Sequence, residues 1–207
     1  MSVLPVDAAT FQERTGVSRE TLERLTVYAG LLRKWQPSIN LVGPKTLNDA
    51  WNRHLFDSAQ LWPHLPAGAR TLVDLGSGAG FPGLVLAVMG VPEVHLIEAD
   101  ARKCAFLREV ARATGTTVTI HNRRIEAVPP FAADVVTARA LAPLPLLLSW
   151  AAPFLSHGGT ALFLKGQTAD DELTEAGKSW TMTAERFPSL TEPSAAILRL
   201  SAITSIQ

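Results

Sequence analysis

The fold of this chain is decided by the stretch VDLGSGAGFPG, residues 73–83. An apolar strand runs into a glycine-rich turn, and the turn leads into a helix. In open α/β sheets, ligands bind above such a turn, because backbone N–H groups and the positive end of the helix dipole face that space. The stretch therefore predicts an α/β sheet with a ligand site at the end of its first strand.

The sequence from Arg70 onward alternates short apolar runs with helical segments, which is typical of a parallel sheet with crossover helices. Residues 181–187 and 195–202 are two apolar or alternating runs joined by a turn-rich segment, and they predict an antiparallel hairpin. Together these patterns predict a doubly wound, mostly parallel sheet that ends in an antiparallel hairpin. We expect parallel strands at Thr71–Leu75, Val94–Glu98, Thr117–His121, Asp134–Ala138 and Thr160–Leu164, and helices at Pro82–Met89, Asp100–Thr114, Pro145–Ala152 and Ala169–Gly177.

The N-terminal third has helical spacing. Ser18 is a suitable N-cap for a run of apolar residues that Pro37 stops, and a second helical stretch runs from Leu47 to Trp62. We therefore expect residues 1–68 to form a helical extension packed on a core of residues 69–207, which would be one Rossmann-like domain. The residues of the second stretch expected on or near one face are Trp51, Leu55, Ser58 and Trp62.

Composition excludes several classes of protein. The 19 basic residues balance 19 acidic residues, so any nucleic-acid surface must be local. Cys104 is the only cysteine, which rules out an internal disulfide, disfavours a thiolate metal cluster and fits a reducing cytosol; we expect no metal site. The N-terminus lacks the pattern of a signal peptide, and the longest apolar stretch, Leu141–Leu155, is interrupted by prolines and too short to span a bilayer. We therefore expect a soluble, cytoplasmic monomer with no membrane contact.

The glycine turn is compatible with two cofactors. Residues 78–83 spell G-x-G-x-x-G, and Glu98 follows 20 residues after Gly78, which is the spacing of a dinucleotide site in an NAD-dependent oxidoreductase. Three observations favour S-adenosylmethionine. Asp74 would repel a pyrophosphate and attract a methionine ammonium group, residues 76–80 have the tighter G-x-G-x-G spacing of methyltransferases, and the chain leaves no room for the second domain of most dehydrogenases. A non-catalytic nucleotide-binding module, or a turn that binds nothing, is the third alternative.

Two further segments lie where a nucleoside would bind. Glu98 ends the second predicted strand and can accept hydrogen bonds from both ribose hydroxyls, although it could also be a surface carboxylate. The segment Arg124-Ile125-Glu126 follows the third strand, in a loop that approaches the adenine in this architecture. A backbone N–H and a carboxylate there could bind the base edge, but an ordinary solvated turn fits the segment nearly as well.

Basic side chains are concentrated in residues 101–125, which hold six of them against a single acid, Glu109. This local excess of positive charge predicts a surface for phosphates of a nucleic acid, because such clusters supply much of the affinity for the backbone. A solvated helix face explains the same residues equally well. The six residues are Arg102, Lys103, Arg108, Arg112, Arg123 and Arg124.

Arg139 follows the fourth strand, which borders both cofactor and acceptor in methyltransferases. The chain lacks the Asn/Asp-Pro-Pro-aromatic motif that many enzymes methylating exocyclic amines of nucleic acids have at this point. A ring nitrogen such as guanine N7 already has an in-plane lone pair, so its methylation needs no general base. A cation would be a poor neighbour for the positively charged product. We therefore assign Arg139 to cofactor or phosphate contact, with an ion pair near the sheet edge as the alternative.

No residue has a certain catalytic role, and three are candidates for positioning the acceptor: Arg139, Lys165 and His54. We expect His54 to pack or to position RNA, and Asp57 and Ser58, at i+3 and i+4, could pair with it. Lys165 ends the fifth strand and is a candidate RNA contact, with a plain solvent-facing lysine as the alternative.

The motifs together resemble the GidB (RsmG) family, once called glucose-inhibited division protein B. The resemblance covers about residues 20–170. Two departures stand out: Gln36-Pro37 replaces the Asn-Lys of many members, and Ser194-Ala195 replaces a basic pair that is a possible RNA contact. The motifs in matching order are Lys34-Trp35 with Asn40-Leu41, Arg53 to Ser58, Asp74 to Gly83, Arg102-Lys103 with Phe106-Leu107-Arg108, Arg124 to Glu126, Arg139-Ala140 and Lys165-Gly166.

The resemblance implies a class I methyltransferase that transfers a methyl group from S-adenosylmethionine to N7 of a guanine in 16S ribosomal RNA, with that RNA or the small ribosomal subunit as partner. A small-molecule methyltransferase is the alternative that shares the fold. By position, the resemblance implies cofactor contacts at Gly76, Phe81, Ile125-Glu126 and Arg139. With the residues argued above, the cofactor candidates are Asp74, Gly76, Ser77, Gly78, Gly80, Phe81, Glu98, Ile125, Glu126 and Arg139. The RNA-binding candidates are Arg53, Arg102, Lys103, Arg123, Arg124 and Lys165.

Overall fold

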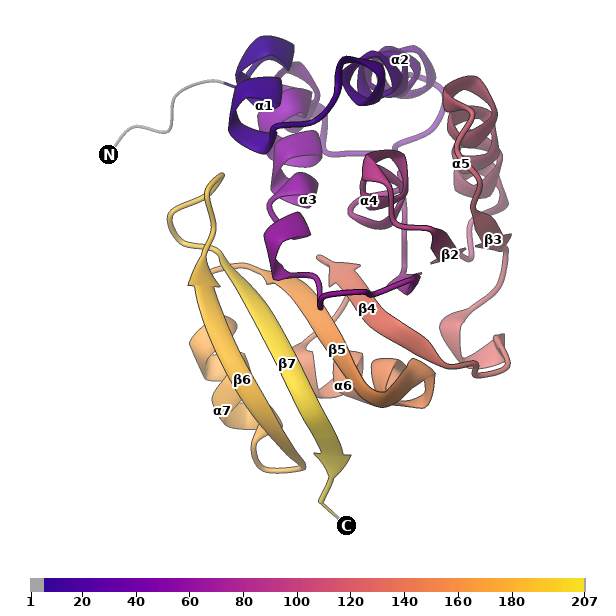
Figure 1. The fold of residues 1–207 in the computed structure, drawn as a ribbon. Coiled ribbons are helices and arrows are strands. Elements are labelled where there is room, and N and C mark those ends of the chain that lie inside the picture. The colour runs from indigo at the N-terminus through magenta and orange to yellow at the C-terminus, as the bar shows by residue number, and fades with distance from the viewer. Residues whose placement is uncertain (1–5, 207) are drawn as a thin grey trace.

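The computed structural model describes residues 6–206, in which one seven-stranded sheet carries helices on both faces (Figure 1). The strands are β1 Thr71–Leu75, β2 Glu93–Ile97, β3 Thr119–His121, β4 Ala133–Arg139, β5 Leu155–Lys165, β6 Trp180–Pro188 and β7 Ala196–Ser205. Their order across the sheet is β3-β2-β1-β4-β5-β7-β6. Strands β1 to β5 run parallel, β7 is antiparallel to β5, and β6 is antiparallel to β7. The doubly wound, mostly parallel sheet with a terminal antiparallel hairpin is therefore confirmed.

The helices divide between the two faces of the sheet, as Figure 1 shows. Those from the first half of the chain pack on one face, and α6 and α7 pack on the other. Side chains alternate along a strand, so successive residues of β1 point to opposite faces of the sheet. Leu72 therefore packs in the apolar cluster on one face, and Val73 packs in the cluster on the other. The helices are α1 Ala8–Thr15, α2 Arg19–Trp35, α3 Asp57–Ala59, α4 Gly83–Met89, α5 Ala101–Thr114, α6 Leu144–Ala151 and α7 Ala169–Ala176, with short 3-10 turns at Ile125–Ala127 and Ala152–Phe154.

Strand boundaries agree with the prediction most closely where the signal is local. Strand β1 has the predicted ends, and β2, β3 and β4 differ from theirs by at most two residues. Strand β5 is the exception, because it begins at Leu155 rather than Thr160. Its first residues, Ser156 to Gly159, break the apolar pattern, and Leu155 pairs with Ala133 across an irregularity in the register with β4. A register shift of this kind leaves no periodic pattern in the sequence, so the sequence could not predict it.

Helix α2 packs against the glycine turn through Tyr28. It begins where predicted, with the Ser18 hydroxyl accepting a hydrogen bond from the Thr21 N–H at 3.2 Å. Fully buried Tyr28 of α2 donates its hydroxyl proton to the Ala79 carbonyl and stacks on Phe81 with ring centres 5.4 Å apart. The helices before residue 69 thus share one apolar layer with α4 and α5. Residues 1–5 of the expected extension lie outside the described residues.

The second predicted N-terminal helix, residues 47–62, is wrong as one continuous helix. The chain instead forms a 3-10 helix at Pro44–Asp49, a π-helix at Trp51–Phe56, the short α3 and a second 3-10 helix at Trp62–His64. A π turn bonds residue i to i+5, so it rotates the residues that follow away from α-helical spacing. Leu55 and Ser58 are buried as expected, whereas Trp62 is 39% exposed.

The strand order reverses between β1 and its neighbour β4, since the chain passes to β2 and β3 on one side and to β5 on the other. In such sheets the connections that follow the two central strands run to opposite sides of the sheet. A crevice therefore opens between them, at the carboxyl ends of these two strands. The glycine turn follows β1 and Arg139 ends β4, so both lie at this crevice. Among residues 6–206, every helix is too short or too polar to cross a bilayer.

Candidate functional site

Two adjoining cavities open at the carboxyl edge of the sheet. The smaller cavity has a volume of about 340 Å³ and is lined by the glycine turn, the end of β2 and the loop after β3. The larger cavity, about 910 Å³, lies between the ends of β4 and β5, the segment around residues 41–57 and the turn between β6 and β7. Arg139, Ala140 and Leu141 line both. Ligands bound in the two cavities would therefore meet at the end of β4.

The glycine turn meets the smaller cavity through Gly76 and Gly78. Gly76 has φ +63°, and a Cβ added there would lie 2.6 Å from Cδ1 of Leu141. A side chain at residue 76 would therefore have to displace the Leu141 side chain, which lines both cavities, and would be strained in this left-handed conformation. The predicted cofactor residues Ser77, Gly80 and Phe81 line neither cavity and pack beneath the turn; their direct contact with a cofactor stays a prediction.

Glu98 is held at the rim of the smaller cavity by backbone donors. Its two carboxylate oxygens accept hydrogen bonds from the N–H groups of Gly78 and Asp100, each at 2.8 Å. A carboxylate oxygen can accept more than one hydrogen bond, so Glu98 keeps capacity for ligand hydroxyls. This fixed carboxylate beside backbone N–H groups is the donor and acceptor set that a ribose next to a glycine turn requires.

Asp74 lies deeper than the sequence suggested. Its side chain is fully buried and lines neither cavity. Its Oδ1 accepts the Thr137 hydroxyl proton at 2.7 Å, while its Oδ2 is buried without a hydrogen-bond partner. Burial raises the pKa of Asp74 to about 6, although the hydrogen bonds from Thr137 and Ser77 oppose that rise. A direct contact with a ligand ammonium group stays a prediction, and the orphaned oxygen is the atom that could make it.

Three members of the predicted basic cluster line the smaller cavity. Lys103, Arg123 and Arg124 line it, together with Ile125 and Glu126 of the predicted adenine loop. Arg102 lies at the start of α5 and pairs with Asp100 at 3.3 Å, with its side chain 72% exposed. The remaining members of the predicted basic cluster, Arg108 and Arg112, lie further along α5, and Arg112 pairs with Glu109 at 2.9 Å. The cluster therefore divides into a part beside the cavity and a solvated helix face.

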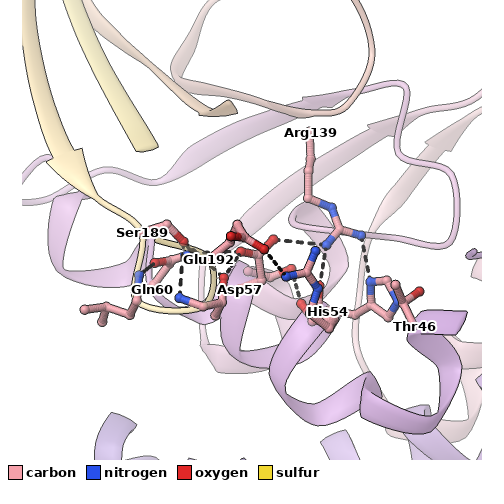
Figure 2. Close-up of polar contacts among 11 residues, drawn as sticks. Thr46, His54, Asp57, Gln60, Arg139, Ser189 and Glu192 are labelled. Carbon is pink, nitrogen blue, oxygen red and sulfur yellow. Dashed lines mark hydrogen bonds and ion pairs between the residues drawn. The ribbon is translucent and has the colours of Figure 1, made fainter. Parts of the chain in front are cut away.

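Arg139 lines both cavities and makes several polar contacts, which Figure 2 shows. Its Nη1 donates to the Arg53 carbonyl at 3.0 Å and pairs with Oδ2 of Asp57 at 3.1 Å, and its Nη2 lies 3.2 Å from Nδ1 of His54. The guanidinium also lies over the Phe81 ring, 5.0 Å from its centre. These contacts, with the side chain only 18% exposed, fix the guanidinium in one orientation. The ion pair considered for Arg139 is therefore present, and its partner is Asp57.

His54 is neutral, and its tautomer follows from its neighbours. Burial, followed by the charges of Arg139 and Arg53, lowers the pKa of His54 to about 3. A guanidinium can only donate, so Nδ1 must accept from Arg139, and Nε2 then carries the proton and donates to the Thr46 hydroxyl at 2.9 Å. Thr46 donates in turn to the Gly43 carbonyl at 2.8 Å. The expected pairing of His54 with Ser58 is present through the backbone, since the Ser58 hydroxyl donates to the His54 carbonyl at 2.7 Å, whereas the expected pairing with Asp57 is wrong, because Asp57 pairs with Arg139 instead.

Lys165 and Arg53, both predicted RNA contacts, line the larger cavity as members of ion pairs. Lys165 is 9% exposed; its Nζ lies 2.6 Å from Glu172 and donates to the Ala142 carbonyl at 2.9 Å. The solvent-facing alternative for Lys165 is therefore wrong, since the neighbouring helix α7 provides a carboxylate that draws the ammonium inward. Arg53 pairs with Glu192 at 2.9 Å, across 139 residues of sequence.

Sequence reasoning missed the acids and the loop that complete the site. Glu172 and Glu192 neutralise predicted cations, and Thr191 donates to Oδ1 of Asp57 at 2.5 Å. Leu141 separates the two cavities. Apart from Glu172, seven residues after Lys165, these partners are distant in sequence from the groups they contact, so no spacing could have identified them. These residues meet because the fold brings separate segments of the chain side by side.

The arrangement can hold a nucleoside in the smaller cavity and orient a second group beside it. Backbone N–H groups of the glycine turn, the Glu98 carboxylate and the cavity volume fit a nucleoside with an amino-acid tail that extends toward Arg139. Among residues 6–206, no group of three or more histidine, cysteine, aspartate or glutamate side chains is placed to hold a metal ion.

Comparison with known proteins agrees with this geometry. Residues 21–198 match the family described as GidB, rRNA small subunit methyltransferase G. A curated relative from Paramagnetospirillum magneticum, Ribosomal RNA small subunit methyltransferase G, is 65% identical over 191 residues that cover 92% of this chain and 93% of the relative.

Solved structures with similar folds are more distant in sequence. A TehB-like SAM-dependent methyltransferase from Corynebacterium glutamicum aligns with a TM-score of 0.55 and 16% identity, covering 72% of this chain and 87% of the other. TYW2 from M. jannaschii, solved in complex with AdoMet, has a TM-score of 0.55 and 15% identity, covering 72% of this chain and 77% of the other.

The fold is accordingly that of class I methyltransferases, and neither the dinucleotide alternative nor the small-molecule alternative fits the family matched. The motifs that carried the resemblance, from Lys34-Trp35 to Lys165-Gly166, all lie within the matched residues. Taken with the two cavities that meet at Arg139, the match over residues 21–198 shows that this chain belongs to the GidB family, the rRNA small subunit methyltransferases G.

Proposed function

We propose that this protein transfers a methyl group from S-adenosylmethionine to N7 of a guanine in 16S ribosomal RNA. The observation that carries the proposal is the meeting of two cavities at Arg139, Ala140 and Leu141, one lined by the glycine turn and one large enough for a nucleotide. Family membership supplies the ribosomal RNA as the acceptor class.

The residues that would hold the cofactor are those of the smaller cavity. Gly76 and Gly78 line the place for the nucleoside, Glu98 offers acceptors for the ribose hydroxyls, and Ile125 with Glu126 borders the place for the adenine. When bound, S-adenosylmethionine supplies an electrophilic methyl group on a sulfonium. Arg139 fixes the boundary between the cavities and orients whatever lies on either side of it.

The side chains of the larger cavity favour an acceptor that needs no base. S-adenosylmethionine would supply the methyl group, and the N7 lone pair would accept it as the carbon–sulfur electron pair stays with sulfur, which would leave the positive charge on the base and release no proton. His54 is buried, neutral and already hydrogen-bonded through both nitrogens, and the three lining acids Asp57, Glu172 and Glu192 are each engaged by a cation. Catalysis would then rest on orientation and on control of charge.

The RNA backbone would contact the exposed cations beside the smaller cavity. Arg102, Lys103, Arg123 and Arg124 supply that positive surface, whereas the charges of Arg53 and Lys165 are already balanced by acids. These two residues would shape the acceptor cavity rather than attract phosphates. We further propose that the protein acts as a cytoplasmic monomer on the small ribosomal subunit.

Two measurements test this function. Titration calorimetry with S-adenosylhomocysteine and with NAD should give heat with the first ligand alone; binding of NAD alone would overturn the cofactor assignment. Labelled S-adenosylmethionine is then incubated with small subunits, or their RNA, from a strain lacking the enzyme, and the modified nucleotide is mapped. A single 7-methylguanosine in 16S RNA is the expected result. Label confined to a parallel incubation with total metabolite extract would refute the RNA assignment.

A further inference from the structure

The acidic side chains that line the larger cavity differ in how far they are exposed to it. Asp57 is 16% exposed; one oxygen pairs with Arg139 and the other accepts from Gln60 and Thr191. Glu172 is 19% exposed, and its oxygens are taken by Lys165, the Leu144 N–H and the Thr168 hydroxyl. These two carboxylates are therefore occupied in holding the walls of the cavity together.

Glu192 is the most exposed acid that lines this cavity, so its oxygens are the most accessible to a ligand. It lies on the turn between β6 and β7, and its side chain is 41% exposed. Its Oε2 accepts only from Nη1 of Arg53 at 2.9 Å, and its Oε1 accepts from the Ser194 hydroxyl at 3.1 Å and from the Ser194 N–H at 3.5 Å. Each carboxylate oxygen can accept about two hydrogen bonds, so Oε2 has one acceptor position left on the open side. Figure 2 shows Glu192 beside Asp57, on the opposite side of it from His54 and Thr46.

The charge of Glu192 is maintained by its partners. The hydrogen bond from Arg53, followed by those from Ser194, lowers the pKa of Glu192 below its ordinary value. Glu192 is therefore ionised at neutral pH, and it lines the larger cavity as the carboxylate of an ion pair with Arg53. The partner Arg53 is fixed in turn, because its own backbone carbonyl accepts a hydrogen bond from Arg139.

Transfer to guanine N7 raises a problem of recognition, because adenine carries the same N7 atom. The two purines differ on the opposite edge: guanine presents two donors, N1–H and N2–H, where adenine presents an acceptor at N1. A carboxylate matches the guanine edge and repels the acceptor of adenine. Reading that edge requires an ionised acid on the wall of the acceptor cavity with at least one free acceptor position.

We infer that Glu192 binds the Watson–Crick edge of the target guanine and thereby selects guanine over adenine. This inference rests on the proposed function and names the group that gives that function its base specificity. It also adds to catalysis. As N7 becomes quaternary, the ring turns cationic, N1–H and N2–H become stronger donors, and their hydrogen bonds to the carboxylate tighten. An interaction that strengthens toward the transition state accelerates the reaction.

The test uses an acceptor that differs by a single donor. Small subunits are assembled on 16S RNA ligated to carry either guanosine or inosine at the nucleotide that the wild-type protein methylates. Inosine keeps N7, O6 and N1–H but lacks the N2 amino group. A hydrogen bond to a charged group corresponds to about 1.5–3 kcal/mol, so wild-type kcat/KM should favour guanosine by about 10- to 150-fold. In Glu192→Gln the ratio should fall at least about fivefold, because a neutral amide oxygen accepts less strongly.

The matched control is Glu185→Gln. Glu185 lies on the same hairpin, pairs with Arg199 at 3.0 Å, and lines neither cavity. It should keep the wild-type ratio of guanosine to inosine. An unchanged ratio in Glu192→Gln, or an equal fall in both variants, would overturn the inference while leaving the proposed function intact. A wild-type protein that methylates neither assembled subunit would instead refute the proposed function.

Discussion

The ion pair between Arg139 and Asp57 should make a large contribution to the stability of the fold. Its atoms lie 3.1 Å apart, and the two side chains are 18% and 16% exposed, so solvent screens the pair only weakly. Removal of one partner from a buried pair leaves the other charge uncompensated, at a cost of about 3–5 kcal/mol. Asp57→Ala would also deprive Gln60 and Thr191 of their acceptor. We therefore expect the free energy of unfolding to fall by about 3–5 kcal/mol in this variant.

The assay is urea unfolding of the wild type, Asp57→Ala, Arg139→Ala and the double variant. Because the second substitution removes the charge that the first leaves unpaired, the double variant should lose about 1–3 kcal/mol less than the sum of the single variants. Glu23→Ala, which breaks an exposed pair with Arg19 in α2, is the control and should change stability by less than about 0.5 kcal/mol. A loss below about 1 kcal/mol in Asp57→Ala, or strict additivity in the double variant, would refute the reasoning.

Three further predictions follow from single features of the site. Burial raises the pKa of Asp74 from 3.8 to about 6, so this carboxyl binds more protons in the folded protein than in the unfolded chain between pH 4 and 6, and its contribution to stability falls as the pH rises through that window. Relative to Asp74→Asn, the wild type should lose about 2 kcal/mol between pH 4 and 7 in urea titrations; parallel pH curves would contradict this. Gly76→Ala should weaken S-adenosylhomocysteine binding about tenfold or more in calorimetry, because its Cβ would collide with Leu141 and a left-handed alanine costs about 1–2 kcal/mol; unchanged affinity would exclude the collision. Arg123→Glu with Arg124→Glu should reduce RNA affinity and make the slope of log affinity against log salt shallower by about 1.4–1.8, whereas an unaltered slope would remove both residues from the interface.

The first strand and the glycine turn were predictable because their determinants are consecutive in sequence. A five-residue strand with three apolar side chains, three glycines at fixed spacing and a helix that follows at once are typical of one arrangement of the backbone. The carboxyl edge of the sheet was predictable for the same reason. Glu98 and Arg139 end strands that the apolar runs identify, so their meeting at one edge follows from the topology.

The segment from Pro44 to His64 was not predictable in detail because tertiary contacts override its helical spacing. Its 3-10, π and α turns are short and have little stability of their own. The segment is held by contacts with distant residues: His54 and Asp57 bind Arg139, and Gln60 accepts a hydrogen bond from the Leu190 N–H at 2.8 Å. A pattern of apolar residues reports which face is buried, and it does not report polar partners supplied by a hairpin 130 residues away.

The basic residues illustrate the limit of reading charge from sequence. Six cations within residues 101–125 appear equivalent, but only Lys103, Arg123 and Arg124 line a cavity. Lys165 and Arg53 appeared as free cations, whereas each is neutralised by a carboxylate that the fold brings to it. The formal charge of a segment therefore differs from the field that a ligand meets, since ion pairing depends on neighbours in space.

The turn between β6 and β7 closes the larger cavity with Thr191 and Glu192. Because a ribosome releases the chain in sequence order, the glycine turn and strands β1 to β5 leave it before this wall exists. A nascent chain at that stage has a place for the nucleoside and no closed place for a base. The wall that Thr191 and Glu192 add to the larger cavity therefore forms last, after the strands that carry the glycine turn and Arg139 have been made.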